Sequence, residues 1–179
     1  LFKAERVLLP IIHKFCLNND LNLVIAGRNF FKVDSNNEEK FYRDIIFKKG
    51  DLITNFIFKH FKDEFSSYDL IDKSKMVVFI DSALGYQSLA RGNKSLACCI
   101  RSNFIKNKNL KFGWPAQFKN EGLFWINSFN KKKIEKKLEV LYNFSNSKWK
   151  KVYEKHRNNL LAYDKENLTF KKIIKKLKK

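Results

Sequence analysis

Apolar runs alternate with segments of helical periodicity from residue 1 to residue 101. Apolar residues that recur every three or four positions predict helices, and short apolar runs bounded by turn residues predict buried strands. The expected helices are residues 3–18, 38–46, 66–71 and 84–91, and the expected strands are residues 21–26, 52–58, 76–80 and 95–100. This alternation is typical of a parallel sheet covered by helices on both faces.

The first predicted helix contains a proline. Leu8, Ile11, Ile12 and Phe15 recur on one face of this segment. Pro10 lacks the backbone donor that a helix interior needs, so we expect the helix to kink there or to begin near it.

The sequence changes character after Arg101. Residues 102–122 are polar and irregular, with the segment FGWP at 112–115, and residues 123–126 predict a last short strand. Helical periodicity then predicts helices at 131–142, from Ser145 or Ser147 to residue 162, and from Leu168 onward. We therefore expect one Rossmann-like α/β domain over residues 1–179, with a helical tail at 131–179 packed on it.

Composition fits one globular domain in a reducing compartment. A chain of 179 residues, 44% of them hydrophobic, is long enough to bury a core. It has neither an apolar run of about 20 residues nor the layout of a secretory signal. Cys16, Cys98 and Cys99 are odd in number, and the last two are adjacent in an apolar run, which favours buried, reduced thiols. We expect a cytoplasmic protein.

The formal charge of +19 favours an anionic partner, because 37 Lys and Arg residues stand against 18 Asp and Glu. Nucleic acid, an anionic membrane surface and a phosphorylated substrate all fit. Abundant Asn, Ile, Phe and Lys are also expected from a genome rich in adenine and thymine, so charge alone does not choose among them. A nucleic-acid-binding basic α/β domain is an alternative, although the sequence has no helix-turn-helix, zinc-finger or RRM motif.

The strongest candidate site lies in the segment MVVFIDSALGYQSLARGNKSLACCI at residues 76–100. Asp81, Ser82 and Gly85 follow a predicted strand and open a predicted helix, where ligands of open parallel sheets bind. A Ser82 hydroxyl can bond a phosphate oxygen, and Gly85 lets a ligand approach the backbone closely. A plain strand-to-helix turn with a serine cap is the alternative. A nucleophile elbow is disfavoured, because Ile80 and Leu84 stand where that turn needs glycines.

The order of several motifs carries a family resemblance. The segments YDLIDKSKMVVFIDSALGYQSLARGNKSLACCIR, FGWP, GLFWIN and YDKENLTFKKII together resemble bacterial surface-carbohydrate biosynthesis proteins of the O-antigen and capsule type. Those proteins look like GT-B-type glycosyltransferases, in which the C-terminal Rossmann-like half holds the nucleotide-sugar donor. The resemblance implies a donor-binding half without its N-terminal acceptor domain. It also implies transfer of a sugar to a surface polysaccharide or lipid-linked acceptor.

By this resemblance, the family pattern D-S-T-L-G-Y-E-A-L-A-R-G falls on residues 81–92, and its strand-end G-R falls on Gly27 and Arg28. Two positions depart from the pattern, Ala83 for threonine and Gln87 for the glutamate that meets ribose hydroxyls. An amide can bond hydroxyls but supplies no charge, so a non-catalytic glycosyltransferase-like remnant is a further alternative. The predicted donor-binding residues are Arg28, Ser66, Ser67, Tyr68, Asp81, Ser82, Leu84, Gly85, Tyr86 and Gln87.

No metal or other cofactor is expected, because the sequence has no D-x-D pair and no His or Cys cluster at ligand spacing. Arg28 and a helix N-terminus would instead stabilise the leaving nucleotide. We assign no catalytic residue, since the acceptor's base often comes from the other half of such enzymes.

The last predicted helix has an apolar face of Phe170, Ile173, Ile174 and Leu177, with lysines around it. This spacing suits docking on the protein body or lying on an anionic membrane surface. The expected location is therefore the cytoplasm, with the inner face of the cytoplasmic membrane as the alternative.

Overall fold

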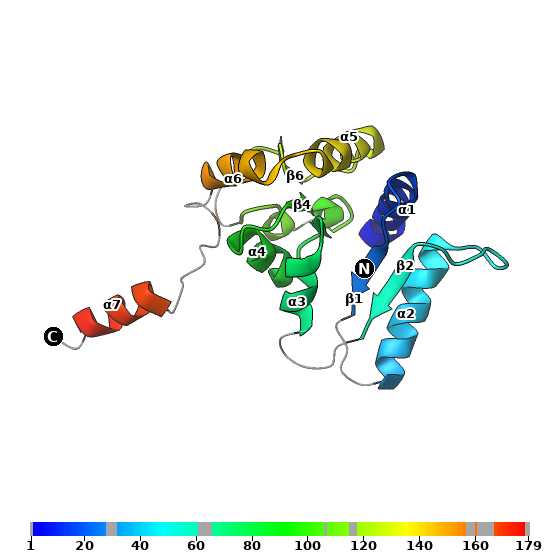
Figure 1. Cartoon of the computed structure of the whole chain (residues 1–179), viewed down its shortest axis with the longest axis horizontal. Coiled ribbons are helices and arrows are strands. Elements are labelled where there is room, and N and C mark those ends of the chain that lie inside the picture. The colour runs from blue at the N-terminus through cyan, green and yellow to red at the C-terminus, as the bar shows by residue number, and fades with distance from the viewer. Residues whose placement is uncertain are drawn as a thin grey trace.

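The computed structural model describes residues 2–27, 32–60, 66–105, 107–114, 118–156, 160 and 167–177. Figure 1 shows helices packed around short strands, with the last helix apart from them. In chain order the elements are α1 (Lys3–Asn18), β1 (Leu23–Ala26), α2 (Lys32–Ile46), β2 (Phe56–Lys59), α3 (Ser66–Lys73), β3 (Val77–Phe79), α4 (Ala83–Ala90), β4 (Ser95–Cys98), the short 3-10 helices η1 (Ile100–Asn103) and η2 (Lys108–Leu110), β5 (Glu121–Gly122), β6 (Trp125–Ile126), α5 (Lys131–Tyr142), α6 (Asn146–Glu154) and α7 (Leu168–Leu177).

The strands form two sheets. β1 and β2 pair in parallel, and the second sheet has the order β3-β4-β6-β5, in which only β5 runs antiparallel to its neighbour. Residues of β1 and β3 line the same cavity without belonging to one sheet. Later strands are therefore added on opposite sides of this cavity: β2 lies beside β1 on one side, and β4 and then β6 follow β3 on the other. The predicted Rossmann-like α/β class, with parallel strands flanked by helices, is confirmed.

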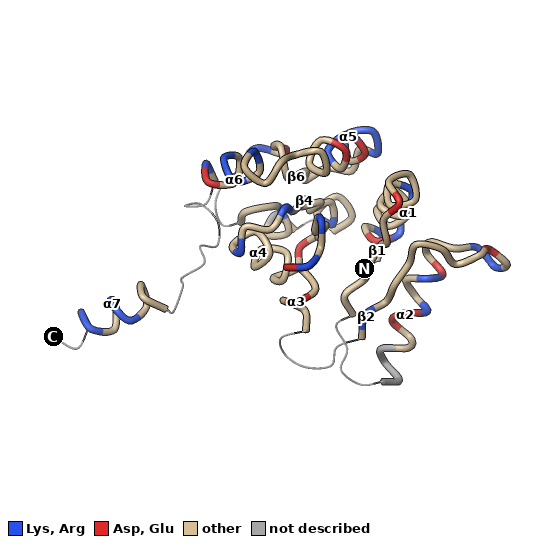
Figure 2. The backbone as a smooth tube through the Cα atoms, viewed as in Figure 1, with Lys and Arg blue, Asp and Glu red and all other residues tan. Residues whose placement is uncertain are grey.

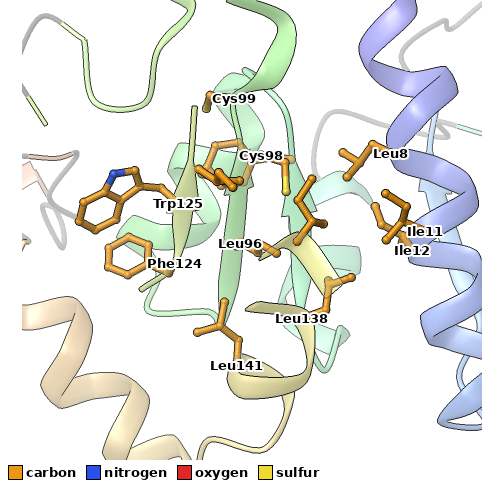
Figure 3. Close-up of a cluster of buried hydrophobic side chains, with 14 of the residues drawn as sticks. Leu8, Ile11, Ile12, Leu96, Cys98, Cys99, Phe124, Trp125, Leu138 and Leu141 are labelled. Carbon is orange, nitrogen blue, oxygen red and sulfur yellow. The ribbon is translucent and has the colours of Figure 1, made fainter. Parts of the chain in front are cut away.

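The main core lies around β4, which is buried along its whole length. Figure 3 shows Leu96 and Cys98 of this strand among side chains from α1 and α5, including Leu8 and Leu138. All four side chains are at most 2% exposed. A strand covered on both faces needs a continuous apolar run rather than alternation, and the sequence SLACCI supplies one.

The aromatic part of this core lies beneath the irregular segment after β4. The Phe112 ring stacks between Tyr86, at a centroid distance of 5.7 Å, and Trp125, at 5.3 Å. The buried Asn127 side chain accepts a hydrogen bond from the Phe112 amide at 2.8 Å. The Asn127 side chain thus satisfies a buried backbone amide of the loop, as a strand or helix partner would, and fixes the loop on the sheet.

The tail helices differ in how they meet the body. α5 buries Ile134, Leu138 and Leu141, and α6 buries Trp149 and Tyr153. α7 buries none of its residues. Lys and Arg residues lie on all three helices, as Figure 2 shows in blue.

Several predicted boundaries were wrong. The strand expected at 52–58 begins only at Phe56, because Leu52 is 82% exposed and Asn55 has a positive φ of 52°. α2 begins at Lys32 rather than at residue 38. The bounds of α1, by contrast, match the helix predicted at 3–18. The helix does not begin at Pro10, whose ring lies on the exposed face, so the carbonyl that it leaves unbonded can meet water. β5 was not predicted.

The three thiols are free and buried, as predicted for Cys16, Cys98 and Cys99. Burial raises the pKa of Cys16 to about 11 and that of Cys98 to about 12. Burial also raises the pKa of Cys99. At neutral pH all three are thiols packed as small apolar side chains.

Candidate functional site

A cavity of about 550 Å³ separates β1 from β3. Its apolar walls include Leu8 and Ile12 from α1 and Val78 from β3, and its polar lining includes Asp81 and Ser82 directly after β3. Small-molecule sites commonly enclose about 300–1,000 Å³. The strand order reverses between β1 and β3, and ligands of open α/β sheets bind at such a reversal, outside the carboxyl ends of the strands.

Ser82 forms the N-cap of α4. Its backbone is extended, with φ −75° and ψ 137°, and its hydroxyl oxygen accepts a hydrogen bond from the Leu84 amide at 3.2 Å. Ser82 and Ala83 are both exposed. Among the described residues, no acceptor bonds the Ala83 amide, so this end of α4 presents an N–H group and the positive end of its dipole to the surface beside the cavity.

A charge cluster stands next to Ser82 and joins three segments. Arg101, just after β4, donates hydrogen bonds from Nη1 to both carboxylate oxygens of Asp81, at 2.7 and 2.8 Å. Its Nη2 donates to Oε1 of Glu5 on α1. The side chains are 22% exposed for Arg101, 20% for Asp81 and 10% for Glu5. Two carboxylates around one guanidinium give the cluster a formal charge of −1.

Gly85 has a packing role that the sequence did not reveal. A Cβ added at Gly85 would lie 2.0 Å from Cγ of the Phe79 ring, so glycine lets α4 approach β3 closely. This contact with Phe79 requires a glycine whether or not a ligand is bound, and close approach of a ligand to Gly85 stays a prediction. The Gly85 backbone still lines the cavity together with Leu84.

Tyr86 points into the aromatic core. Its hydroxyl oxygen accepts a hydrogen bond from the Gly113 amide at 2.9 Å. The pKa of Tyr86 is raised to about 12, mainly because the side chain is buried. Neither Tyr86 nor Gln87, both half-buried, lines the cavity. Their donor-binding roles stay predictions without a geometric contact to the candidate site.

The cavity thus brings together Asp81, Ser82, Leu84 and Gly85. α3 contributes Leu70 and Ile71 to its wall, whereas Ser66, Ser67 and Tyr68 do not line it. The Tyr68 ring instead lies 5.5 Å from the Arg91 guanidinium carbon. Arg28 lies outside the described residues, directly after Gly27 at the end of β1.

Sequence reasoning missed two residues of the site, Glu5 and Arg101. Arg101 directly follows the strand predicted at 95–100, and in the structure it lies in η1, three residues after the end of β4. Glu5 lies on the buried face of α1 beside Leu8 and Leu9, and a charged residue on an apolar face signals a buried partner. Within the described ranges, no three His, Cys, Asp or Glu side chains are placed to hold a metal ion.

A sequence model of one protein family, described as "putative O-antigen biosynthesis protein", matches residues 1–178. The chain belongs to this family. No curated protein and no solved structure matches it. The O-antigen part of the family resemblance is confirmed, and the family description associates the chain with O-antigen biosynthesis.

Proposed function

We propose that this chain is a donor-binding domain of a GT-B-type glycosyltransferase, with a nucleotide-sugar held between β1 and β3. One observation carries the proposal: the cavity reaches the exposed N-cap Ser82 where the strand order reverses. A cavity of about 550 Å³ has the volume for a small ligand with apolar and polar parts.

The phosphate groups of the donor fit at the start of α4. Fixed N–H groups and the helix dipole favour an anion there, and the Ser82 hydroxyl can donate to a phosphate oxygen while still accepting from Leu84. As the bond from sugar to phosphate breaks, negative charge grows on the leaving nucleotide. Donors that are already oriented stabilise this charge without a metal.

The charge cluster limits where the donor's groups can lie. Since Arg101 is shared by Asp81 and Glu5, the cluster repels phosphate, but its carboxylates accept hydrogen bonds from neutral hydroxyls. We therefore assign Asp81 to a sugar or ribose hydroxyl rather than to phosphate. The acceptor would be a polysaccharide or a lipid-linked sugar, and no residue of this chain is assigned as its base.

A charge reversal tests the phosphate position without removing the helix cap. Ser82→Asp keeps an N-cap acceptor but places a negative charge where the phosphate would bind. Ser145→Asp is the matched control, because Ser145 is the N-cap of α6, its hydroxyl oxygen accepts from the Lys148 amide at 3.2 Å, and it does not line the cavity. The measurement is the melting temperature with UDP, GDP, CMP and their sugars.

We expect one nucleotide class to raise the melting temperature of the unaltered chain and of Ser145→Asp, but not of Ser82→Asp. Equal stabilisation of both variants would remove the assigned site. A salt-sensitive gel shift with DNA, without any nucleotide effect, would favour the nucleic-acid alternative. Nucleotide binding by a preparation that contains its acceptor domain, yet transfers no sugar, would identify a non-catalytic remnant.

A further inference from the structure

Helix α7 separates apolar and basic residues on opposite faces. At helical spacing, Ile173, Ile174 and Leu177 share one face with Phe170, and the opposite face is basic. Leu177 is 77% exposed and Ile173 is 50% exposed. The lysines of this helix are Lys171, Lys172, Lys175 and Lys176.

Charge on this segment has one sign. From residue 168 to residue 179 the sequence contains six lysines and no acidic residue. Figure 2 shows blue but no red on α7, and Figure 1 shows the helix apart from α5 and α6. Exposure of the Ile173 and Leu177 side chains to water is unfavourable, and a basic opposite face points to an anionic partner.

We propose that α7 lies flat on an anionic bilayer surface, with its apolar face among the acyl chains and its lysines at the headgroups. A bilayer interface meets both faces at once, whereas a nucleic acid would use the lysines and leave the apolar face in water. An apolar protein groove would bury the apolar face but would offer no negative charge to the four lysines. Charge complementarity therefore decides for the membrane.

Helix length determines the mode of binding. The ten residues of α7 extend about 15 Å, which is half of the hydrocarbon thickness of about 30 Å. None of the described helices is long and apolar enough to span a bilayer. α7 would therefore hold the protein at the membrane surface, and this inference is independent of nucleotide binding in the cavity.

Sedimentation with vesicles tests the apolar face. The full chain is mixed with phosphatidylcholine vesicles that contain or lack phosphatidylglycerol. We expect binding to the anionic vesicles, and a loss of at least about tenfold in the partition coefficient for Ile173→Ser/Leu177→Ser. Leu168→Ser is the matched control: Leu168 is 52% exposed but lies on the lysine face, so binding should stay within about twofold of the unaltered chain.

The lysines are tested separately. Lys172→Gln should lower the partition coefficient about fivefold, which corresponds to about 1 kcal/mol. Lys150→Gln on α6 removes the same charge from an exposed position away from α7 and should leave binding nearly unchanged. Added salt should weaken binding of the unaltered chain, because it screens the lysines.

Three results would overturn the proposal. The full chain could stay in the supernatant with anionic vesicles. Ile173→Ser/Leu177→Ser could bind as well as the unaltered chain, which would mean that charge elsewhere on the protein carries the interaction. Sedimentation velocity without vesicles could show a dimer that the same double substitution dissociates, which would assign the apolar face to a second copy of the chain. Unchanged melting temperatures would show that the variants are folded.

Discussion

The guanidinium of Arg101 lies against the carboxylate of Asp81, with Nη1 2.7 Å from Oδ1 and 2.8 Å from Oδ2. The same guanidinium bonds Glu5, so the segments that follow β3 and β4 are joined to α1 in the lining of the cavity. Among the described residues, Nε of Arg101 and Oε2 of Glu5 are buried without a hydrogen-bond partner. The stability of the two carboxylates in this site therefore depends strongly on the Arg101 guanidinium.

Replacing that cation should destabilise the fold. Arg101→Met leaves two carboxylates facing each other in a site that is mostly closed to water. We expect the free energy of unfolding to fall by about 2–4 kcal/mol, since a charge left unpaired in a largely buried site is costly. Urea unfolding followed by tryptophan fluorescence measures this loss.

The matched control is Arg91→Met. Arg91 also bonds a carboxylate twice, from Nε to the two oxygens of Asp72 at 2.8 and 3.1 Å. That pair is exposed, at 32% and 36% for the two side chains, so its loss should cost about 1 kcal/mol or less. Equal losses for the two arginines would contradict the structural role given to the Arg101 cluster.

Gly85 should be intolerant of even one added carbon. Alanine is usually better than glycine in a helix by about 1 kcal/mol. At Gly85, however, the new Cβ would meet the Phe79 ring, and overpacking of this kind costs about 1–3 kcal/mol. We expect Gly85→Ala to lower the free energy of unfolding in urea.

A double-mutant cycle tests the cause. Phe79→Leu removes the ring and leaves space for the methyl group of Gly85→Ala. The two substitutions together should cost less than the sum of their separate costs. Strict additivity would place the clash elsewhere and would leave Gly85 open to its original interpretation as a point of ligand approach.

Local sequence patterns predicted elements whose signals are themselves local. The helix expected at 131–142 is α5, because its apolar spacing lies within the segment and its cap, Asn130, directly precedes it. The serine cap at Ser82, the alternative interpretation of that turn, is likewise a local signal and is present. Leu52 was assigned to a strand because it is apolar, but its exposure depends on the surrounding fold.

The site could be predicted only in part, because its contacts join distant segments. Glu5 and Arg101 are 96 positions apart, and no periodicity connects them. The contact between Gly85 and Phe79 depends on how closely a helix approaches a sheet, which local patterns do not specify. Tyr86 matches the family pattern in sequence, yet its hydroxyl group bonds a loop that lies 27 residues further along the chain.

Tyr86→Phe separates loop anchoring from donor binding. The substitution removes the acceptor of the Gly113 amide, and an unsatisfied, largely buried N–H group should cost about 1–2 kcal/mol of unfolding free energy. Since Tyr86 does not line the cavity, the affinity for the nucleotide that stabilises the unaltered chain should not change. If Tyr86→Phe instead weakened nucleotide affinity without lowering the free energy of unfolding, Tyr86 would be a donor-binding residue, as the sequence predicts.

His156 should make part of the stability dependent on pH. Its ring packs edge-on against Trp125 at a centroid distance of 5.0 Å, and burial is the main cause that lowers its pKa from the usual 6.5, with Lys155 adding to the effect. Below pH 6.5 the unfolded chain therefore takes up a proton on this ring before the folded chain does. The stability that the neutral His156 ring contributes to the folded chain is therefore complete above pH 6.5. It is lost as the pH falls from 6.5 through the lower pKa of the folded chain.

His156→Phe keeps an aromatic ring against Trp125 but cannot titrate. The free energy of unfolding of the unaltered chain, relative to His156→Phe, should therefore decline on acidification through this interval and stay constant above it. Urea midpoints across the interval measure that difference, and the His156 ring protons in NMR spectra report its pKa directly. Lys155→Gln should raise this pKa, because it removes the nearby positive charge. A difference that does not vary with pH would mean that the ring is as easily protonated in the folded chain as in the unfolded one, which its packing against Trp125 opposes.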